Sequence, residues 1–251
     1  MSRRVHGAGA EPIYRYRRRT QNQRDDSTLQ EIVVVIPAHN ERDRIPACLA
    51  SVGAAAARVA VPVTVVVVLD GCTDGSQHVV AGPVRTLRIA ARNVGAARAF
   101  GFARAAGAVD TQTWYATTDA DSVVPVTWLS AQMNHHRNGD HAMVGTVGVD
   151  WRHHSSTTQR TYERLYERRY EGPGHGHVHG ANLGVRADVY WQVGGFRALG
   201  TGEDVDLVER LVRADARIVW DRRNPVITSD RPDSRVSGGF GDYVGDLVGQ
   251  P

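Results

Sequence analysis

The chain has 251 residues, a formal net charge of +3, and a composition of 41% hydrophobic and 23% charged residues. These values are ordinary for a globular protein of one domain, and they exclude a disordered chain, a collagen-like repeat and a coiled coil. The longest aliphatic runs, at residues 32–36 and 63–69, are far shorter than the about 20 residues that a membrane-spanning helix needs. Cys48 and Cys72 are too few for a disulfide framework, so we expect reduced thiols and a cytoplasmic location.

Residues 1–30 form a polar, basic leader. Every basic residue of the chain is an arginine, and seven of them precede the first predicted strand. Nothing apolar anchors this segment, so we interpret it as a flexible, solvated tail, with contact to an anionic membrane surface left open. The body that follows is close to neutral, which argues against a nucleic-acid partner.

Residues 31–126 alternate between strand and helix patterns. β-branched runs bounded by turn residues predict strands at residues 31–37, 63–70, 85–89 and 113–118. Apolar residues at helical spacing predict helices at residues 41–59, 74–81 and 94–108, with Asn40 as the N-cap of the first. This alternation predicts an α/β fold with a doubly wound, mostly parallel sheet flanked by helices.

The second half of the chain is less regular. It contains predicted helices at residues 126–138, 157–171, 186–193 and 203–215, and predicted strands at residues 141–151 and 217–220. No repeat and no linker interrupts the pattern. We therefore expect a single domain over residues 31–228, followed by a C-terminal tail at residues 229–251.

Acidic and turn-forming residues follow three of the predicted strands, as Pro37-Ala38-His39-Asn40-Glu41, Asp70-Gly71-Cys72-Thr73-Asp74-Gly75-Ser76 and Asp119-Ala120-Asp121-Ser122. In an open α/β sheet the carboxyl ends of parallel strands meet at one edge, where ligands bind. Two carboxylates separated by one small residue can hold Mg²⁺ or Mn²⁺, which complete their coordination with substrate phosphates. An isolated Asp-Xaa-Asp is more often a solvated turn, but a position directly after a buried strand favours the metal site.

Six segments, taken in chain order, resemble glycosyltransferase family 2. They are the three segments above, Asn93-Val94-Gly95, Gly180-Ala181-Asn182, and Gly194-Gly195-Phe196 ahead of Gly202-Glu203-Asp204-Val205-Asp206-Leu207. The resemblance covers residues 32 to about 220. It implies a single GT-A domain, a nucleotide-sugar donor, a divalent metal (Mn or Mg), a hydroxyl acceptor, and usually inversion at the anomeric carbon.

The resemblance also implies which residues bind the donor. They are Pro37, Ala38, His39, Glu41, Asp70, Asn93, Arg98, Asp119, Ala120 and Asp121. The Pro37-Ala38-His39 backbone and Glu41 would hold the nucleobase and ribose, and Asp70 would hydrogen-bond the base, usually uracil in this family. Arg98 would contact the donor phosphate. Asp121 would ligate the metal, and Asp119 would face the ribose and the metal's hydration shell.

Two further segments would serve the transferred sugar and the acceptor. Gly180, Ala181 and Asn182 would line the pocket for the donor sugar and acceptor. Asp204 would be the general base that takes the proton of the acceptor hydroxyl, with Glu203 orienting the substrate. Elementary chemistry supports this assignment, because a carboxylate at a helix N-terminus can accept that proton. Plain helix capping is the alternative interpretation of the Glu203-Asp204 pair.

The pattern departs from the family after the last predicted strand. Many relatives place a metal-binding histidine there, whereas this chain has Asp230 and Arg231. Either Asp230 or water would then take the histidine's place, or Asp121 and the diphosphate would hold the metal more loosely. Arg231 and Arg235 could clamp the diphosphate, since guanidinium groups suit phosphate, and the tail that carries them could close over the donor site.

The segment His175-Gly176-His177-Val178-His179 has two interpretations. Imidazoles at this spacing can converge on a metal ion. The surrounding glycines favour a loop on the acceptor side that orders when substrate binds, and this is the interpretation that we prefer.

Other functions remain as alternatives. A nucleotidyltransferase would need a lysine-bearing phosphate loop, and the chain has no lysine. A nicotinamide-dependent oxidoreductase would need a G-x-G-x-x-G segment after the first strand, which is absent. A catalytically inactive module that only binds a nucleotide sugar is the remaining alternative to a transferase that uses UDP- or GDP-linked sugar.

Overall fold

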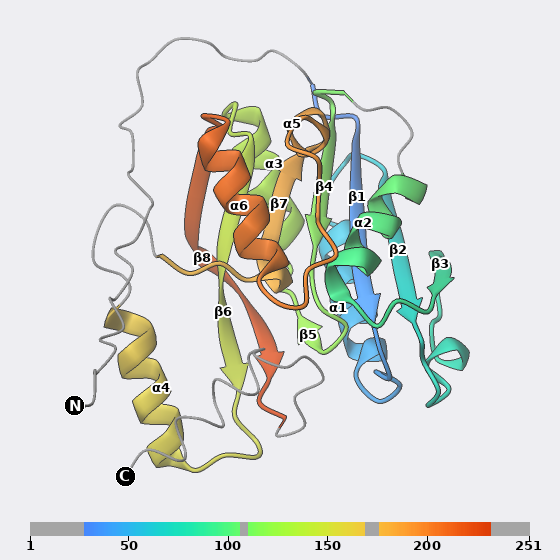
Figure 1. Cartoon of the computed structure of the whole chain (residues 1–251), viewed down its shortest axis with the longest axis vertical. Coiled ribbons are helices and arrows are strands. Elements are labelled where there is room, and N and C mark those ends of the chain that lie inside the picture. Colours follow the sequence, from blue (N-terminus) through green and yellow to red (C-terminus); the bar gives the residue numbers. More distant parts are fainter. Residues whose placement is uncertain (1–27, 106–109, 169–175, 232–251) are drawn as a thin grey trace, which may run out of the picture.

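An eight-stranded mixed sheet forms the centre of the computed structural model, which describes residues 28–105, 110–168 and 176–231 (Figure 1). Its strands are β1 (Glu31–Ala38), β2 (Val63–Asp70), β3 (Val84–Ile89), β4 (Thr113–Thr117), β5 (Ser122–Val123), β6 (Ala142–Asp150), β7 (Leu183–Arg186) and β8 (Ile218–Ser229). The predicted leader and the predicted tail lie almost wholly outside the described residues, so those two boundaries stay predictions.

The strand order is β3-β2-β1-β4-β7-β6-β8-β5. β1, β2, β3 and β4 pair in parallel, as the alternating pattern of the first half predicts. β7 pairs antiparallel with both β4 and β6, while β8 is parallel to β6 and antiparallel to β5. The predicted α/β fold with a mostly parallel sheet is confirmed, and each antiparallel pairing involves β7 or β8 from the second half.

Helices cover both faces of the sheet. They are α1 (Ile45–Ala56), α2 (Val94–Ala105), α3 (Trp128–Arg137), α4 (Ser156–Arg168), α5 (Ala187–Gln192) and α6 (Glu203–Arg213). In Figure 1, α2, α5 and α6 lie in front of the sheet, α1 and α3 lie behind it, and α4 stands away from it at the lower left. No helix in the described ranges is both long and apolar enough to cross a bilayer.

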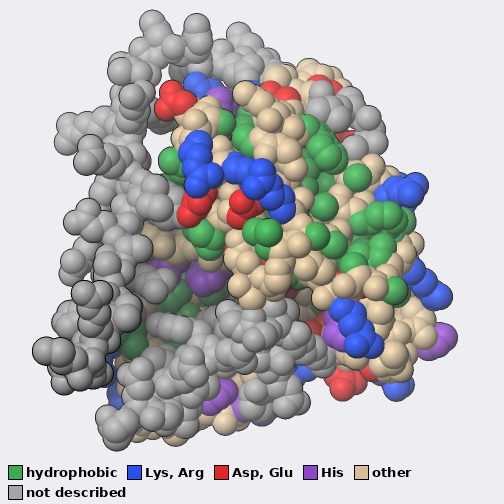
Figure 2. Space-filling model, in the orientation of Figure 1, with side chains coloured by type: hydrophobic (Ala, Val, Ile, Leu, Met, Phe, Trp, Pro, Cys, Tyr) green, Lys and Arg blue, Asp and Glu red, His purple; other side chains and the backbone are tan. Residues whose placement is uncertain are grey.

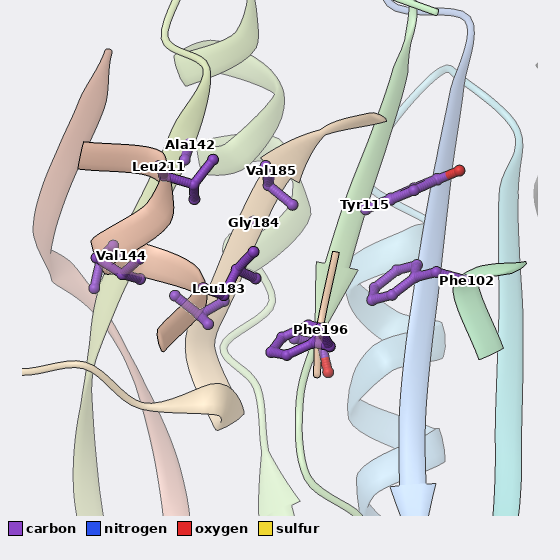
Figure 3. A pocket seen from close by; sticks show the side chains of 12 residues that line it. Phe102, Tyr115, Ala142, Val144, Leu183, Gly184, Val185, Phe196 and Leu211 are labelled. Atoms are coloured by element: carbon purple, nitrogen blue, oxygen red, sulfur yellow. The ribbon is translucent and has the colours of Figure 1, made fainter. Parts of the chain in front are cut away.

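The aliphatic strands divide the core into two layers, because successive side chains of a strand point to opposite faces. Ile32, Val34 and Ile36 of β1 pack with α1 and α3, whereas Val33 and Val35 pack with α2, α5 and α6. Aromatic rings fill the second layer: Phe102 of α2 stacks on Tyr115 of β4, with 4.6 Å between ring centroids. Figure 3 shows this layer around an apolar void of only about 10 Å³, so the core is closely packed.

Charged side chains remain at the surface of the front helices. Over α6, basic and acidic groups lie next to one another (Figure 2), including Arg213 with Glu209 at 2.7 Å and Arg197 with Asp206 at 3.3 Å. This mixture of signs is typical of a solvated protein surface.

Local interactions explain where the elements differ from the predictions. The helix predicted at residues 74–81 is one 3-10 turn at Ser76–His78, because the Asp74 carboxylate accepts a hydrogen bond from the Ser76 amide and Gly75 has φ of 85°. Asn40 does not cap α1, which begins four residues later than predicted. Asn40 itself has a φ of 56°, and its side-chain oxygen accepts a hydrogen bond from the Thr73 amide at 2.7 Å. β5 and β7 were not predicted, since two and four residues are too short to show a pattern.

Candidate active site

A cavity of about 740 Å³ opens at the carboxyl ends of β1, β2 and β4. The N-terminus of α6, residues 177–181 and α4 form its opposite walls. The predicted site residues that line it are Pro37, Ala38, His39, Glu41, Asp70, Asn93, Arg98, Asp119, Ala120, Asp121, Gly180, Ala181, Glu203, Asp204 and Arg231. A volume of this size is typical of a small-molecule site. The structure therefore brings together residues from seven separate segments of the chain.

Asp70, at the end of β2, organises the turn that leads into α2. Its two carboxylate oxygens accept hydrogen bonds from the backbone amides of Arg92 and Asn93, both at 2.7 Å. The Asn93 side chain in turn caps α2 through the Ala96 amide and donates to the Leu199 carbonyl at 2.7 Å. Asn93 thus lines the cavity but uses its amide group to hold two chain segments together.

Acidic side chains gather beside β4. Burial raises the pKa of Asp121 to about 6, Arg231 opposes this rise, and the carboxylates of Asp119 and Glu41 add to it. Arg231 lies between two of these carboxylates, with Nη1 2.5 Å from Glu41 Oε1 and Nη2 3.3 Å from Asp121 Oδ2. The cluster therefore gathers three carboxylates, whose charge Arg231 and Arg44 partly offset.

Arg98 connects this acidic cluster to the N-terminus of α6. Its side chain is 2% exposed, and Nη2 donates to Asp119 Oδ1 at 2.6 Å while Nη1 pairs with Glu203. Burial raises the pKa of Glu203, and the Arg98 charge opposes that rise. Both terminal nitrogens of Arg98 are therefore engaged with carboxylates. Arg98 also lines the cavity, and its predicted contact with the donor phosphate stays a prediction.

Replacing Arg98 with Met should lower the free energy of unfolding by about 3–5 kcal/mol, because two carboxylates would lose their buried cation. Arg104 on the same helix provides the control: it is exposed, and Arg104→Met should change stability by less than about 0.5 kcal/mol. Urea denaturation measures both. A loss below about 1 kcal/mol for Arg98→Met would show that the bridge between Asp119 and Glu203 is unimportant for stability.

Asp204 lies in the first turn of α6, after Gly202, whose φ of 73° suits glycine. Asp204 Oδ2 accepts a hydrogen bond from the Gly180 amide at 2.7 Å, and Asp204 Oδ1 accepts one from the Val205 amide at 2.8 Å. These two bonds fix the carboxylate at the cavity wall, and each oxygen keeps a further lone pair for a ligand.

Asn182 is placed differently from the prediction that it contacts the sugar. Its side chain is fully buried and is not part of the cavity lining. Asn182 Oδ1 accepts a hydrogen bond from Trp128 Nε1 at 2.9 Å, and Asn182 Nδ2 donates to the carbonyls of Thr146 and Asn224. Asn182 therefore supports Gly180 and Ala181 from beneath, because its polar groups already have partners inside the protein.

Asp230, one of the predicted replacements for the missing histidine, is not part of the cavity lining. Its side chain is fully buried and accepts hydrogen bonds from the amides of Arg152 and His153 and from the His153 ring at 2.7 Å. Burial would raise the pKa of Asp230, but these bonds hold it below its usual range. Arg235, the second predicted phosphate clamp, lies outside the described residues.

The histidine segment forms part of the cavity wall. The His177 ring stacks on Tyr166 of α4 at 3.7 Å, and its Nε2 lies 2.8 Å from the Tyr166 carbonyl. The Tyr166 hydroxyl bonds to His179 Nε2 at 3.2 Å. Residues 28–105, 110–168 and 176–231 contain no group of three or more His, Cys, Asp or Glu arranged to hold a metal ion. His177 and His179 both bond to Tyr166. His175, the third histidine of the segment, lies outside the described residues.

Arg92 also lines the cavity, although no motif predicted it. It directly precedes Asn93, and this position beside a predicted donor-binding residue was the one available signal.

Comparisons with known proteins show the family and the fold. The family model of glycosyl transferase family 2 matches residues 33–194. A mannosyltransferase from Pyrobaculum calidifontis, solved with GDP-Man and Mn²⁺, has a TM-score of 0.63 at 17% identity, covering 85% of this chain and 61% of its own. S. aureus TarS residues 1–349, solved with UDP-GlcNAc, has a TM-score of 0.59 at 14% identity, covering 87% and 65%. A search of the curated proteins found no match.

These matches settle the fold and the family. The chain spans less than two thirds of the length of either solved structure, so the activities of those whole proteins are not transferred to it. The similarity does show that the sheet and its flanking helices form the predicted GT-A domain. The family model covers well over half of the chain. The chain belongs to glycosyl transferase family 2.

Proposed function

We propose that the protein transfers a sugar from a nucleoside-diphosphate sugar to a hydroxyl acceptor, with a divalent metal and with inversion at the anomeric carbon. One observation carries this proposal: Asp70, Asp121 and Asp204, which come from distant parts of the chain, line a single cavity of about 740 Å³. Such a reaction needs a leaving diphosphate to be neutralised and a proton to be removed from the acceptor, and this cavity offers groups for both.

We propose that the acidic cluster binds a divalent metal ion together with substrate phosphates, since the described residues hold no group of three or more ligands that could bind one alone. Asp121 is mostly buried beside two further carboxylates, Asp119 and Glu41, and burial is the main cause of its raised pKa, with a smaller contribution from these two charges. Oxygen ligands of this kind suit Mg²⁺ or Mn²⁺, which take their remaining ligands from phosphates and water. Asp121 would hold the ion and Asp119 would face its hydration shell. When bound, the ion would neutralise charge on the departing diphosphate.

The chain's own residues would handle the rest of the donor. Pro37, Ala38 and His39 line the side of the cavity where Asp70 lies, so they suit the nucleobase and ribose. Arg231 would exchange its contact with Asp121 for one with the diphosphate, since guanidinium forms paired hydrogen bonds with phosphate. Gly180 and Ala181 would pack against the transferred sugar.

Asp204 would act as the general base. The amides of Gly180 and Val205 orient its carboxylate, so a lone pair can accept the proton of the acceptor hydroxyl. The deprotonated oxygen then forms a bond to the anomeric carbon, while the bond from that carbon to the phosphate oxygen breaks and the nucleoside diphosphate leaves. Glu203 would hold Arg98 in place, because it pairs with that cation.

Thermal denaturation with nucleotides tests the binding half of this proposal. GDP or UDP with Mn²⁺, at a hundredfold excess over the dissociation constant, should stabilise the protein by about 2.7 kcal/mol. For a chain of this size that corresponds to a rise in Tm of roughly 5–10 °C.

Two outcomes of that experiment would count against the proposal. A failure of every nucleoside diphosphate to raise Tm would contradict it outright. Stabilisation without release of nucleoside diphosphate from any sugar donor, across a panel of acceptors, would favour an inactive binding module instead.

A further inference from the structure

Three arginines line the cavity, and they differ in their partners. Arg98 pairs with Asp119 and Glu203, and Arg231 pairs with Glu41 and Asp121. Arg92 is exposed, and within the described parts of the chain its guanidinium has neither a hydrogen bond nor an ion pair. Arg92 is therefore the cavity arginine whose donor groups are available to a ligand.

The backbone at Arg92 is held in an unusual conformation. Its φ is 48°, in the left-handed region that residues other than glycine rarely adopt. The Asp70 carboxylate stabilises this turn by accepting the amides of Arg92 and Asn93. Strained positions of this kind persist where the surroundings fix them, and they gather at ligand sites. Asp70 therefore fixes the point from which the Arg92 side chain leaves the backbone.

The Arg92 side chain lies over the end of β2. A Cβ added to Gly71 would be 3.4 Å from Arg92 Cγ, 3.6 Å from Arg92 Nε and 3.9 Å from His39 Cε1. His39 is itself tied to this strand end, with Nδ1 2.5 Å from the Asp70 carbonyl. Arg92 and His39 thus flank Gly71 beside the Asp70 carboxylate, on the side of the cavity that the proposed function gives to the nucleobase.

We propose that the donor nucleotide carries guanine, and that Asp70 and Arg92 together select it; this inference rests on the proposed function. The Asp70 oxygens each keep one acceptor site after bonding the two amides. The N1–H and N2–H₂ groups of guanine would donate to those two sites. The adjacent O6 and N7 of guanine are two acceptors that match the paired donors of an arginine.

The other bases fit this pair of groups less well. Adenine N1 and cytosine N3 are acceptors, and each would face the Asp70 carboxylate without a proton between them. Uracil offers N3–H to Asp70, but it has a single acceptor, O4, on the side where Arg92 could reach. Asp70 thus excludes adenine and cytosine, and Arg92 distinguishes guanine from uracil.

Calorimetric titration of the full chain with GDP and UDP, each with Mn²⁺, tests the assignment. We expect GDP to bind at least about tenfold more tightly than UDP, a difference of about 1.4 kcal/mol. Arg92→Met should reduce that preference to less than about threefold, mainly by weakening the binding of GDP. Arg88→Met, an exposed arginine of β3 outside the cavity lining, should leave the preference unchanged.

Arg92→Lys separates a contact with the base from a contact with the phosphates. It retains the positive charge but lacks the paired donors, so it should lose the preference for GDP as Arg92→Met does. If Arg92→Met weakened the binding of GDP and of UDP equally, and Arg92→Lys restored both affinities, Arg92 would contact the diphosphate. That result would overturn the assignment. Tighter binding of UDP by the wild-type protein would overturn it too. Failure of both nucleotides to bind would instead contradict the proposed function, and this inference with it.

Discussion

Asp204→Asn is expected to lower sugar transfer by about 10²–10⁴-fold while leaving nucleotide affinity unchanged. Asparagine has nearly the same shape, and its carbonyl oxygen can still accept one of the two amides that orient Asp204. It cannot take a proton from the acceptor hydroxyl. Release of nucleoside diphosphate from a sugar donor measures the first quantity, and calorimetric titration with GDP and Mn²⁺ measures the second.

Asp206→Asn is the matched control, because Asp206 lies two residues away on the same helix. Its carboxylate pairs with Arg210 and Arg197 and does not line the cavity. This variant should therefore retain transfer. If Asp204→Asn retained turnover within a few-fold of the wild type, Asp204 would not be the general base.

Asp121→Asn should stabilise the protein without ligand and abolish metal-dependent nucleotide binding. The pKa of Asp121 is raised from 3.8 to about 6, so at pH 7.5 the folded state holds a carboxylate that burial and its acidic neighbours disfavour. Removing that charge should raise the free energy of unfolding by about 2–3 kcal/mol. Arg231 keeps its partner Glu41 in this variant. Functional sites often lower stability in this way.

The pH dependence provides the control for Asp121→Asn. Since the folded-state pKa is raised, the destabilising effect of Asp121 is complete above about pH 6 and disappears as pH falls toward 3.8. Urea denaturation should therefore show a more stable variant at pH 7.5 and a much smaller difference near pH 4. A variant that is less stable at pH 7.5 would contradict the unfavourable burial of the Asp121 charge. A variant that still responds to Mn²⁺ when GDP binds would contradict the metal role of Asp121.

Three strands of the first half, β1, β2 and β4, could be predicted closely because they are largely buried on both faces. Such strands are continuous β-branched runs, and the polar residues where they end, at Asp70 and Asp119, therefore stand out. β8 was predicted only at residues 217–220 and continues to Ser229, since its later residues alternate in burial and include Pro225. The predicted strand ends thus indicated where the cavity lies, whereas the length of the partly buried strand β8 was underestimated.

The roles of individual side chains were harder to predict than their location. Asn182 belongs to a motif segment and Arg98 lies three residues after one, yet each directs polar atoms at other protein groups. Arg92 carries no motif signal, yet it is the arginine available to a ligand. A sequence states which residue types are close along the chain, whereas these roles depend on contacts between residues more than 20 positions apart, such as Arg92 with Asp70.

A crystal structure with GDP and Mn²⁺, in which the anomalous signal locates the manganese, tests the central claim most directly. The claim predicts one ion bound to an oxygen of Asp121 and to the diphosphate, with the guanine ring next to Asp70. An ion held instead by His177 or His179, or a nucleotide bound outside the cavity between Asp70 and Asp204, would contradict the account.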